Sequence, residues 1–196
     1  MSSTTIGILH PGAMGSAIAA AARAGGRPVY WVSAGRSSAS RDRAEKAGLQ
    51  EISRLRQLVE TCSILLSVCP PAAAEEVAQE VTAAGFRGLY LDANAISPAV
   101  ARRIAETVED GGARFVDGGI VGGPDFSSGG TFLYLAGEMA GEVAALFSAS
   151  PLSTRGLEGP PGAASALKMA YAAYTKGTTA LIGAILALAE HEQVLE

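Results

Sequence analysis

The chain has 196 residues, of which 48% are hydrophobic, and it carries a formal net charge of −4 with two histidines. This length suffices for one well-buried domain. The net negative charge argues against a basic surface that binds nucleic acid. Two histidines are too few for a His-rich metal site. Cys62 and Cys69 lie in or beside one apolar run, which favours free thiols in a reducing compartment over a disulfide framework.

The sequence shows neither a signal peptide nor a membrane span. Its N-terminus lacks the basic region and the long apolar core of a secretory signal. The longest apolar stretch, Ala180–Ala189, has about ten residues and is shorter than the roughly 20 that cross a bilayer. We therefore expect a soluble cytoplasmic protein with no membrane partner.

Short apolar runs alternate with helical patterns from Thr5 to Ala149. The predicted strands are Thr5–Leu9, Val29–Val32, Ile64–Val68, Leu89–Asp92, Phe115–Gly118 and Phe132–Ala136. The predicted helices are Ser16–Ala24, Ser37–Ala47, Ile52–Glu60, Ala72–Ala84, Pro98–Asp110 and Gly141–Ala149. This alternation predicts an α/β fold with a Rossmann-type, doubly wound and mostly parallel sheet. Ligands of such sheets bind beyond the carboxyl ends of the strands, so we expect the site there.

The first strand leads through a glycine turn into an Ala-rich helix and then a second strand, which is the start of a dinucleotide-binding βαβ unit. His10 stands where the usual G-x-G-x-x-G fingerprint has its first glycine. The turn lets backbone N–H groups approach a pyrophosphate at the positive end of a helix. The residues predicted to contact the cofactor there are Pro11, Gly12, Ala13 and Met14.

The second strand ends in serines and an arginine, where a carboxylate would be expected for a ribose with a free 2′-hydroxyl. Ser33, Arg36 and Ser37 would instead suit a 2′-phosphate, so the predicted cofactor is NADP(H). The alternative is that Arg36 is a solvated loop residue, as are Arg41 and Arg43 on the next helix.

Two further strand ends are predicted to lie near the cofactor. Cys69 and Pro70 follow the third predicted strand, and Asn94 follows the fourth. Asn94 would bond the nicotinamide ribose or carboxamide, or else form an Asx turn before Pro98.

A cluster of glycines and prolines from Gly156 to Gly162 marks a boundary, beyond which no strand pattern returns. We predict a cofactor-binding domain over residues 1–158 and, within residues 159–196, one long helix from Ala163 to Leu195. The helix would be about 50 Å long, with possible bends at Gly177 and Gly183. The helix is apolar on almost all sides, so its surface must be buried against other protein. We expect a homodimer through this helix, with residues beyond Glu196 as the alternative cover.

Four segments resemble the β-hydroxyacid dehydrogenases, relatives of 6-phosphogluconate dehydrogenase and of the imine reductases. Gly12–Gly15 resembles the family's cofactor turn, and Asp92–Pro98 resembles its Asp-x-Ser-Thr-x-Ser-Pro strand end. Asp117–Gly123, followed by Gly129-Gly130-Thr131, resembles the substrate-binding segment. Gly162–Lys168 resembles the opening of the interdomain helix. The resemblance implies that residues 159–196 begin a helical dimerisation or substrate domain that is truncated or missing. The resemblance places Lys168 as the catalytic lysine, and it implies that the substrate contacts Val121, Gly122 and Gly123.

The role implied for Lys168 makes chemical sense. When hydride leaves a C–OH group, the hydroxyl proton must leave too, and a lysine whose pKa is lowered by burial can accept it. A charged lysine can instead stabilise an oxyanion, and the structural alternative is a lysine that snorkels from an amphipathic helix. Tyr171 and Ala172 replace the family's asparagine, so Tyr171 either takes over hydrogen bonding or proton transfer, or only packs.

The resemblance implies an NADP-dependent oxidoreductase that transfers hydride between NADP(H) and a small hydroxy acid or carbonyl substrate. Val121 stands where the family often has a serine, and Asn94 where it has a hydroxyl residue, which weakens the case for an ordinary 3-hydroxy acid. The alternatives are an imine reductase of the same superfamily and a non-catalytic NADP-binding module. The non-catalytic module is an alternative because the family continues from this helix into an all-helical domain that closes the substrate cleft, whereas this sequence stops at Glu196.

Overall fold

The computed structural model of the chain describes residues 4–195. Its strands are β1 (Ile6–Ile8), β2 (Val29–Val32), β3 (Gln50–Ile52), β4 (Ile64–Ser67), β5 (Leu89–Asp92), β6 (Arg114–Val121), β7 (Phe132–Ala136) and β8 (Ser153–Gly156). Its helices are α1 (Ala13–Arg23), α2 (Ser38–Lys46), α3 (Leu55–Thr61), α4 (Ala74–Ala83), α5 (Pro98–Asp110), α6 (Ala140–Leu146) and α7 (Ala163–His191), with a short 3-10 helix, η1 (Pro71–Ala73), before α4.

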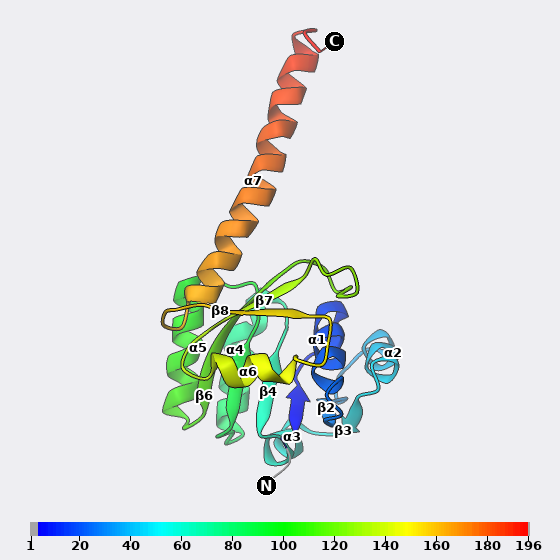
Figure 1. Cartoon of the computed structure of the whole chain (residues 1–196), viewed down its shortest axis with the longest axis vertical. Coiled ribbons are helices and arrows are strands. Elements are labelled where there is room, and N and C mark those ends of the chain that lie inside the picture. Colours follow the sequence, from blue (N-terminus) through cyan, green and yellow to red (C-terminus); the bar gives the residue numbers. More distant parts are fainter. Residues whose placement is uncertain (1–3, 196) are drawn as a thin grey trace.

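The strands form one sheet in the order β3-β2-β1-β4-β5-β6-β7-β8 (Figure 1). Neighbouring strands run parallel, except that β7 pairs antiparallel with β6. The strand order reverses at β1, which lies between β2 and β4, and such a switch point is where doubly wound sheets bind ligands. The predicted Rossmann-type α/β fold, followed by one long helix, is confirmed.

Alternate residues of the strands supply two apolar cores, one on each face of the sheet. In β4, Ile64 and Leu66 belong to the core that contains α1 and α6, whereas Leu65 belongs to the core that contains α3, α4 and α5. A strand covered on both faces reads as a continuous apolar run. This is why the sequence predicted the central strands β1, β4 and β5.

The two edge strands of the sheet, β3 and β8, are not among the strands predicted from the sequence. β3 contains the exposed residues Gln50 and Glu51, and β8 reads Ser-Thr-Arg-Gly, so neither shows an apolar run. Because Ile52 ends β3, the helix predicted from Ile52 begins instead at Leu55.

Several predicted boundaries also shift. Helix α1 begins at Ala13 rather than Ser16, directly after the glycine turn. Strand β6 runs to Val121, beyond the predicted Gly118, because it pairs along its length with β7. Helix α7 ends at His191 rather than Leu195.

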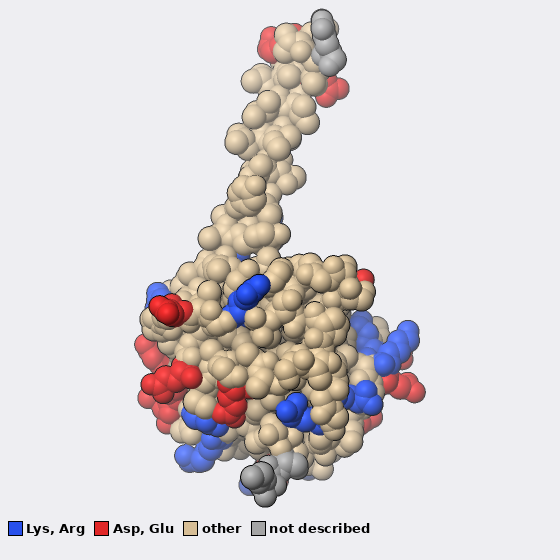
Figure 2. Space-filling model, viewed as in Figure 1, with Lys and Arg blue, Asp and Glu red and all other residues tan. Residues whose placement is uncertain are grey.

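Helix α7 leaves the sheet as a single unbroken rod (Figure 1). Gly177 and Gly183 continue the helix and do not interrupt it. Of its described residues only Ala164 and Ser165 are buried, so the sheet domain covers only the base of the rod. Figure 2 shows a face of the rod without charged side chains between its base and its tip. Apolar side chains along it are widely exposed, among them Leu181 at 62% and Leu188 at 63%.

By length and composition, α7 is the one helix in residues 4–195 that could cross a membrane. The prediction from the sequence considered only the ten residues Ala180–Ala189, which are too few to cross a bilayer. Threonines, alanines and glycines before Ala180 extend the weakly apolar part of the helix towards the N-terminus. Its uncharged part, between Lys176 and Glu190, is about 20 Å long at 1.5 Å per residue. A bilayer core is roughly 30 Å thick, so the uncharged part alone is shorter than a bilayer core.

Candidate functional site

Two cavities flank the turn between β1 and α1, at the carboxyl ends of the strands. The first, of about 220 Å³, is lined by His10 at the start of the turn. The second, of about 210 Å³, is lined by Met14 in the first turn of α1. An elongated ligand that crosses the turn would therefore have one end in each cavity.

The turn itself is built for a close ligand approach. The Gly12 N–H donates to the carbonyl oxygen of His10 at 2.9 Å, and Gly12 forms the N-terminal cap of α1. A Cβ atom on Gly15 would collide with the His10 carbonyl, so Gly15 is required by the packing of α1 on β1. A Cβ on Gly12 would meet nothing within 4 Å. This open space at the N-terminus of an eleven-residue helix fits a pyrophosphate.

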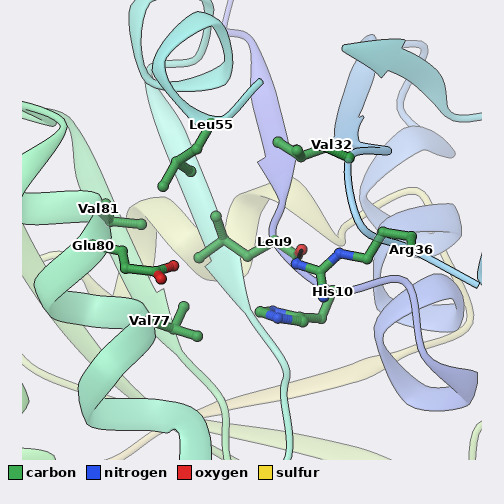
Figure 3. A pocket seen from close by; sticks show the side chains of 9 residues that line it. Leu9, His10, Val32, Arg36, Leu55, Val77, Glu80 and Val81 are labelled. Carbon is green, nitrogen blue, oxygen red and sulfur yellow. Dashed lines mark hydrogen bonds between the residues drawn. The ribbon is translucent and has the colours of Figure 1, made fainter. Parts of the chain in front are cut away.

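The first cavity has aliphatic walls and three polar side chains, from His10, Arg36 and Glu80 (Figure 3). Burial, and then the nearby Arg36 guanidinium, lower the pKa of His10 to about 4, so its imidazole is neutral near pH 7. His10 Nδ1 and Arg36 Nε are both buried and have no hydrogen-bond partner among residues 4–195. Buried polar atoms are nearly always paired, so these two atoms fit a polar ligand in the cavity.

Three arginines are fixed around the ends of β1 and β2. Arg36 donates from Nη2 to the carbonyl oxygen of Leu9 at 3.2 Å, and Arg43 donates from Nε to that of Pro11 at 3.1 Å. Arg41 donates to the carbonyl oxygen of Ser33 and pairs with Glu51 on β3. The reading of Arg41 and Arg43 as purely solvated residues is therefore wrong, because each bonds the backbone that surrounds the predicted cofactor site.

The two predicted serines at this strand end have structural partners. Ser37 caps α2 by accepting the Ser40 N–H at 3.3 Å. Ser33 is 5% exposed, and its hydroxyl, together with Arg41, lowers the pKa of Glu51. Their hydroxyls thus hold the loop between β2 and α2 in shape.

The second cavity brings together residues that are distant in the sequence. Met14, Cys69, Asn94, Gly122 and Lys168 all line it, from five different segments of the chain. Among the residues between 4 and 195 that line it, Lys168 alone is charged. Burial, with a smaller effect of Lys176, lowers the pKa of Lys168 from its ordinary value. A lysine with this environment, beside the glycine turn, can act in proton transfer.

Asn94 holds the floor of this cavity together. Its Nδ2 donates to Ser67 Oγ at 3.0 Å and to Asp92 Oδ2 at 2.9 Å, and its Oδ1 accepts the Cys69 N–H at 2.6 Å. Asn94 is 2% exposed, so most of its hydrogen-bonding capacity is used inside the protein. Burial raises the pKa of Asp92 to about 7. The hydrogen bonds that Asp92 accepts from the backbone N–H and from Nδ2 of Asn94 partly oppose this rise.

A buried carboxylate on β6 fixes the start of α7 and thereby the position of Lys168. Asp117 Oδ2 accepts the N–H groups of Gly162 at 2.9 Å and Ser165 at 3.0 Å, and Oδ1 accepts the Ser165 hydroxyl. Gly119 permits close packing, because a Cβ there would lie 2.6 Å from the Ala164 carbonyl oxygen and 3.3 Å from Lys168 Cβ. The substrate-like segment and the lysine are therefore held against each other.

Several predicted site residues do not line either cavity. Tyr171 is 43% exposed, one turn above Lys168.

Two predicted segments line the second cavity only in part. Pro71 lines it where Pro70 was predicted, and Gly122 lines it without Val121 or Gly123. The Gly123 carbonyl accepts the Thr131 hydroxyl at 2.8 Å. Burial, followed by Asp92, raises the pKa of the Cys69 thiol to about 11.

Two lining residues with ionisable side chains, His10 and Glu80, were not predicted as site residues. His10 was noted only because it replaces the first glycine of the G-x-G-x-x-G fingerprint, and no contact with a ligand was predicted for it. Glu80 is an exposed residue on an acidic helix face, like Glu76, and only its neighbours Val77 and Val81 indicate that it borders the cavity.

Comparisons with known proteins agree with this geometry. Residues 5–152 match the family described as the NAD-binding domain of 6-phosphogluconate dehydrogenase. The solved structure of MTH1747, a conserved protein of unknown function with structural similarity to 3-hydroxyacid dehydrogenases, is 29% identical, with a TM-score of 0.80. The match covers 97% of this chain and 71% of that one. No curated protein sequence matches the chain.

Two further solved structures share the fold. The 3-hydroxyisobutyrate dehydrogenase of Mycobacterium tuberculosis is 19% identical, with a TM-score of 0.82, and the match covers 98% of this chain and 67% of that one. A reductive aminase from Aspergillus terreus, in complex with NADPH4, cyclohexanone and allyl amine, is 24% identical, with a TM-score of 0.79 and coverage of 99% and 68%. This chain thus spans about two thirds of the length of these proteins.

Proposed function

The chain belongs to the family of the NAD-binding domain of 6-phosphogluconate dehydrogenase, and on that basis we propose that it is an NADP-dependent oxidoreductase. The proposed reaction transfers hydride between NADP(H) and a small hydroxy acid or carbonyl substrate. The observation that carries this proposal is the second cavity, where Lys168 lies beside Met14 of the glycine turn and Gly122 of the substrate-like segment.

The residues present fit such a cofactor. The open space at Gly12 suits the pyrophosphate, the first cavity suits the adenosine end, and the second leaves room for the nicotinamide ring near Lys168. The proposed cofactor-binding residues are Pro11, Gly12, Ala13, Met14, Ser33, Arg36, Ser37, Cys69, Pro70 and Asn94. Arg36, Arg41 and Arg43 favour a 2′-phosphate, because guanidinium groups bind phosphate in charge-assisted hydrogen bonds.

The bound cofactor supplies the ring that donates or accepts hydride. Lys168 then acts on the substrate oxygen: its Nζ donates a proton as a carbonyl is reduced and takes the proton back in the reverse direction. Burial lowers the pKa of Lys168, which eases proton release. Asp117 and Gly119 position the lysine, and Tyr171 would contact only a substrate that extends up α7.

Replacing Arg36 by alanine is expected to weaken NADPH binding by about tenfold, the effect of losing about 1.4 kcal/mol of charge-assisted bonding. NADH binding should change by less than about twofold, because NADH lacks the 2′-phosphate. Calorimetric titration of both cofactors measures this. Arg87→Ala, an exposed arginine before β5, serves as the control. Equal losses for the two cofactors would refute the phosphate role.

An imine reductase is the second candidate, and one observation favours it. Apart from Lys168, the lining of the second cavity is uncharged and largely apolar, with Met14, Val68 and Ile120 among its residues. Such a lining suits a neutral imine better than the carboxylate of a hydroxy acid, which would have Lys168 as its only cationic partner among the lining residues. NADPH oxidation with a panel of aldehydes, keto acids and cyclic imines distinguishes these reactions, and NADPH binding without any oxidation would support a non-catalytic module.

We further propose that α7 is covered by a second copy of the chain and that the protein is cytoplasmic, with both cysteines as free thiols. Leu181, Ile185 and Leu188 have the i, i+4, i+7 spacing of one helix face and are each more than half exposed. An apolar surface of this extent is unusual on a monomer.

The double variant Leu181→Glu with Leu188→Glu is expected to be monomeric, because two carboxylates would be buried in the interface. Light scattering measures the mass, and Gln79→Glu, which adds a charge on the exposed side of α4, should leave it dimeric. A monomeric wild-type protein would contradict the proposed dimer.

A further inference from the structure

The first cavity has a polarity that differs from one side to the other. Figure 3 shows the Glu80 carboxylate extending from α4 towards Leu9, while His10 and Arg36 occupy the opposite side. Aliphatic side chains, including Val32, Leu55, Val77 and Val81, make up the remaining walls. The cavity therefore suits a flat, largely apolar ligand with a hydrogen-bond donor at one edge and an acceptor or anionic group at the other.

The exposed Glu80 carboxylate is free to accept a hydrogen bond from a ligand in the cavity. Its carboxylate forms no hydrogen bond and no ion pair within residues 4–195, in contrast to Glu75 on the same helix, which pairs with Arg103 at 2.8 Å. An ionised carboxylate only accepts hydrogen bonds. Glu80 can therefore select a ligand edge that carries N–H groups.

We propose that Glu80 recognises the base of the cofactor by accepting a hydrogen bond from the 6-amino group of adenine. This inference rests on the proposed NADP binding and adds to it a residue that determines base specificity. Adenine is planar, which suits the aliphatic walls, and its exocyclic amine is its strongest donor. Glu80 thus selects adenine over bases that lack this amine.

Charge fixes the direction in which the ligand lies. The phosphate groups of the cofactor are repelled by the Glu80 carboxylate and attracted by the Arg36 guanidinium. The sugar and phosphates therefore face His10 and Arg36, next to the α1 N-terminus, and the base edge faces Glu80. A ribose hydroxyl both donates and accepts, so it can bond the unpartnered His10 Nδ1 in either tautomer of the neutral ring.

The test compares NADPH with an analogue in which purine, with hydrogen in place of the 6-amino group, replaces adenine. Both are titrated calorimetrically into the wild-type protein and into the Glu80→Ala, Glu80→Gln and Glu76→Ala variants. Glu76 is the matched control, because it is exposed on α4 one turn before Glu80 and does not line the cavity. Glu80 is itself exposed as a residue, so its replacement should leave the fold intact.

The wild-type protein and Glu76→Ala are expected to bind NADPH about tenfold more tightly than the purine analogue, the effect of one charge-assisted hydrogen bond. Glu80→Ala should reduce this preference to less than about twofold, and Glu80→Gln should keep part of it, because a neutral amide oxygen is a weaker acceptor. An unchanged preference in Glu80→Ala would overturn this inference alone. No heat with NADPH in the wild-type protein would overturn the proposed function itself.

Discussion

Replacing Lys168 by methionine is expected to lower kcat for NADPH oxidation by about 10²- to 10⁴-fold, the usual contribution of a positioned general acid or base. Methionine keeps much of the side-chain length and apolar stem of lysine while removing the proton donor. The dissociation constant for NADPH should change little, because the cofactor-binding turn and the first cavity lie on other elements. Steady-state kinetics with the best substrate of the panel, together with calorimetry, measure the two effects separately.

Lys176→Met is the informative control for this prediction. The positive charge of Lys176 lowers the pKa of Lys168, so its removal should raise that pKa and leave the maximal rate nearly unchanged. In the reducing direction Lys168 must be protonated, and the rate therefore falls as the pH rises through its pKa. The alkaline limb of the pH–rate profile should move to higher pH in Lys176→Met. A Lys168→Met protein with full activity would remove the lysine from the mechanism.

Replacing Asp117 by alanine is expected to destabilise the fold by about 3–5 kcal/mol, since it leaves three buried donors without an acceptor. Asp117 and Ser165 are both 0% exposed, so water cannot easily replace the lost bonds. The free energy of unfolding from urea denaturation measures the effect. Because Asp117 caps α7, the variant should also lose activity at urea concentrations that leave the wild-type protein active.

Two variants bracket this prediction. Ser165→Ala removes only the hydroxyl bond to Asp117 and should cost about 1 kcal/mol. Asp110→Ala, an exposed carboxylate at the end of α5, should change stability by less than about 0.5 kcal/mol. A value for Asp117→Ala close to that of Asp110→Ala would show that α7 is held by other contacts.

The relation between prediction and structure is clearest at the end of β2. The sequence placed Arg36 beside the cofactor, because an arginine in place of a carboxylate after the second strand is a local signal. It gave no reason to separate Arg43 from an ordinary solvated helix residue. Arg43 differs because the packing of α2 brings its guanidinium within 3.1 Å of the Pro11 carbonyl, 32 positions away in the chain.

Asn94 and Tyr171 illustrate the same limit in the second cavity. Both were singled out as polar residues at suitable positions, one after a strand and one on the helix face of Lys168. In the structure the Asn94 amide forms a hydrogen-bond network with Ser67 and Asp92, and Tyr171 is 43% exposed and lines neither cavity. Position along an element is read from the sequence, but the direction of a side chain depends on its neighbours.

The sequence by itself determined the central strands, the glycine turn, the long apolar helix and the segment that carries Lys168. Each of these depends on residues adjacent in the chain: apolar runs buried on both faces, a turn that opens a helix, or a family-like motif. Only the tertiary structure decided the edge strands β3 and β8, the Asp117 cap on α7, and the meeting of His10, Arg36 and Glu80 in one cavity. These features arise where elements far apart in the sequence pack together, and no local periodicity encodes which side chains meet there.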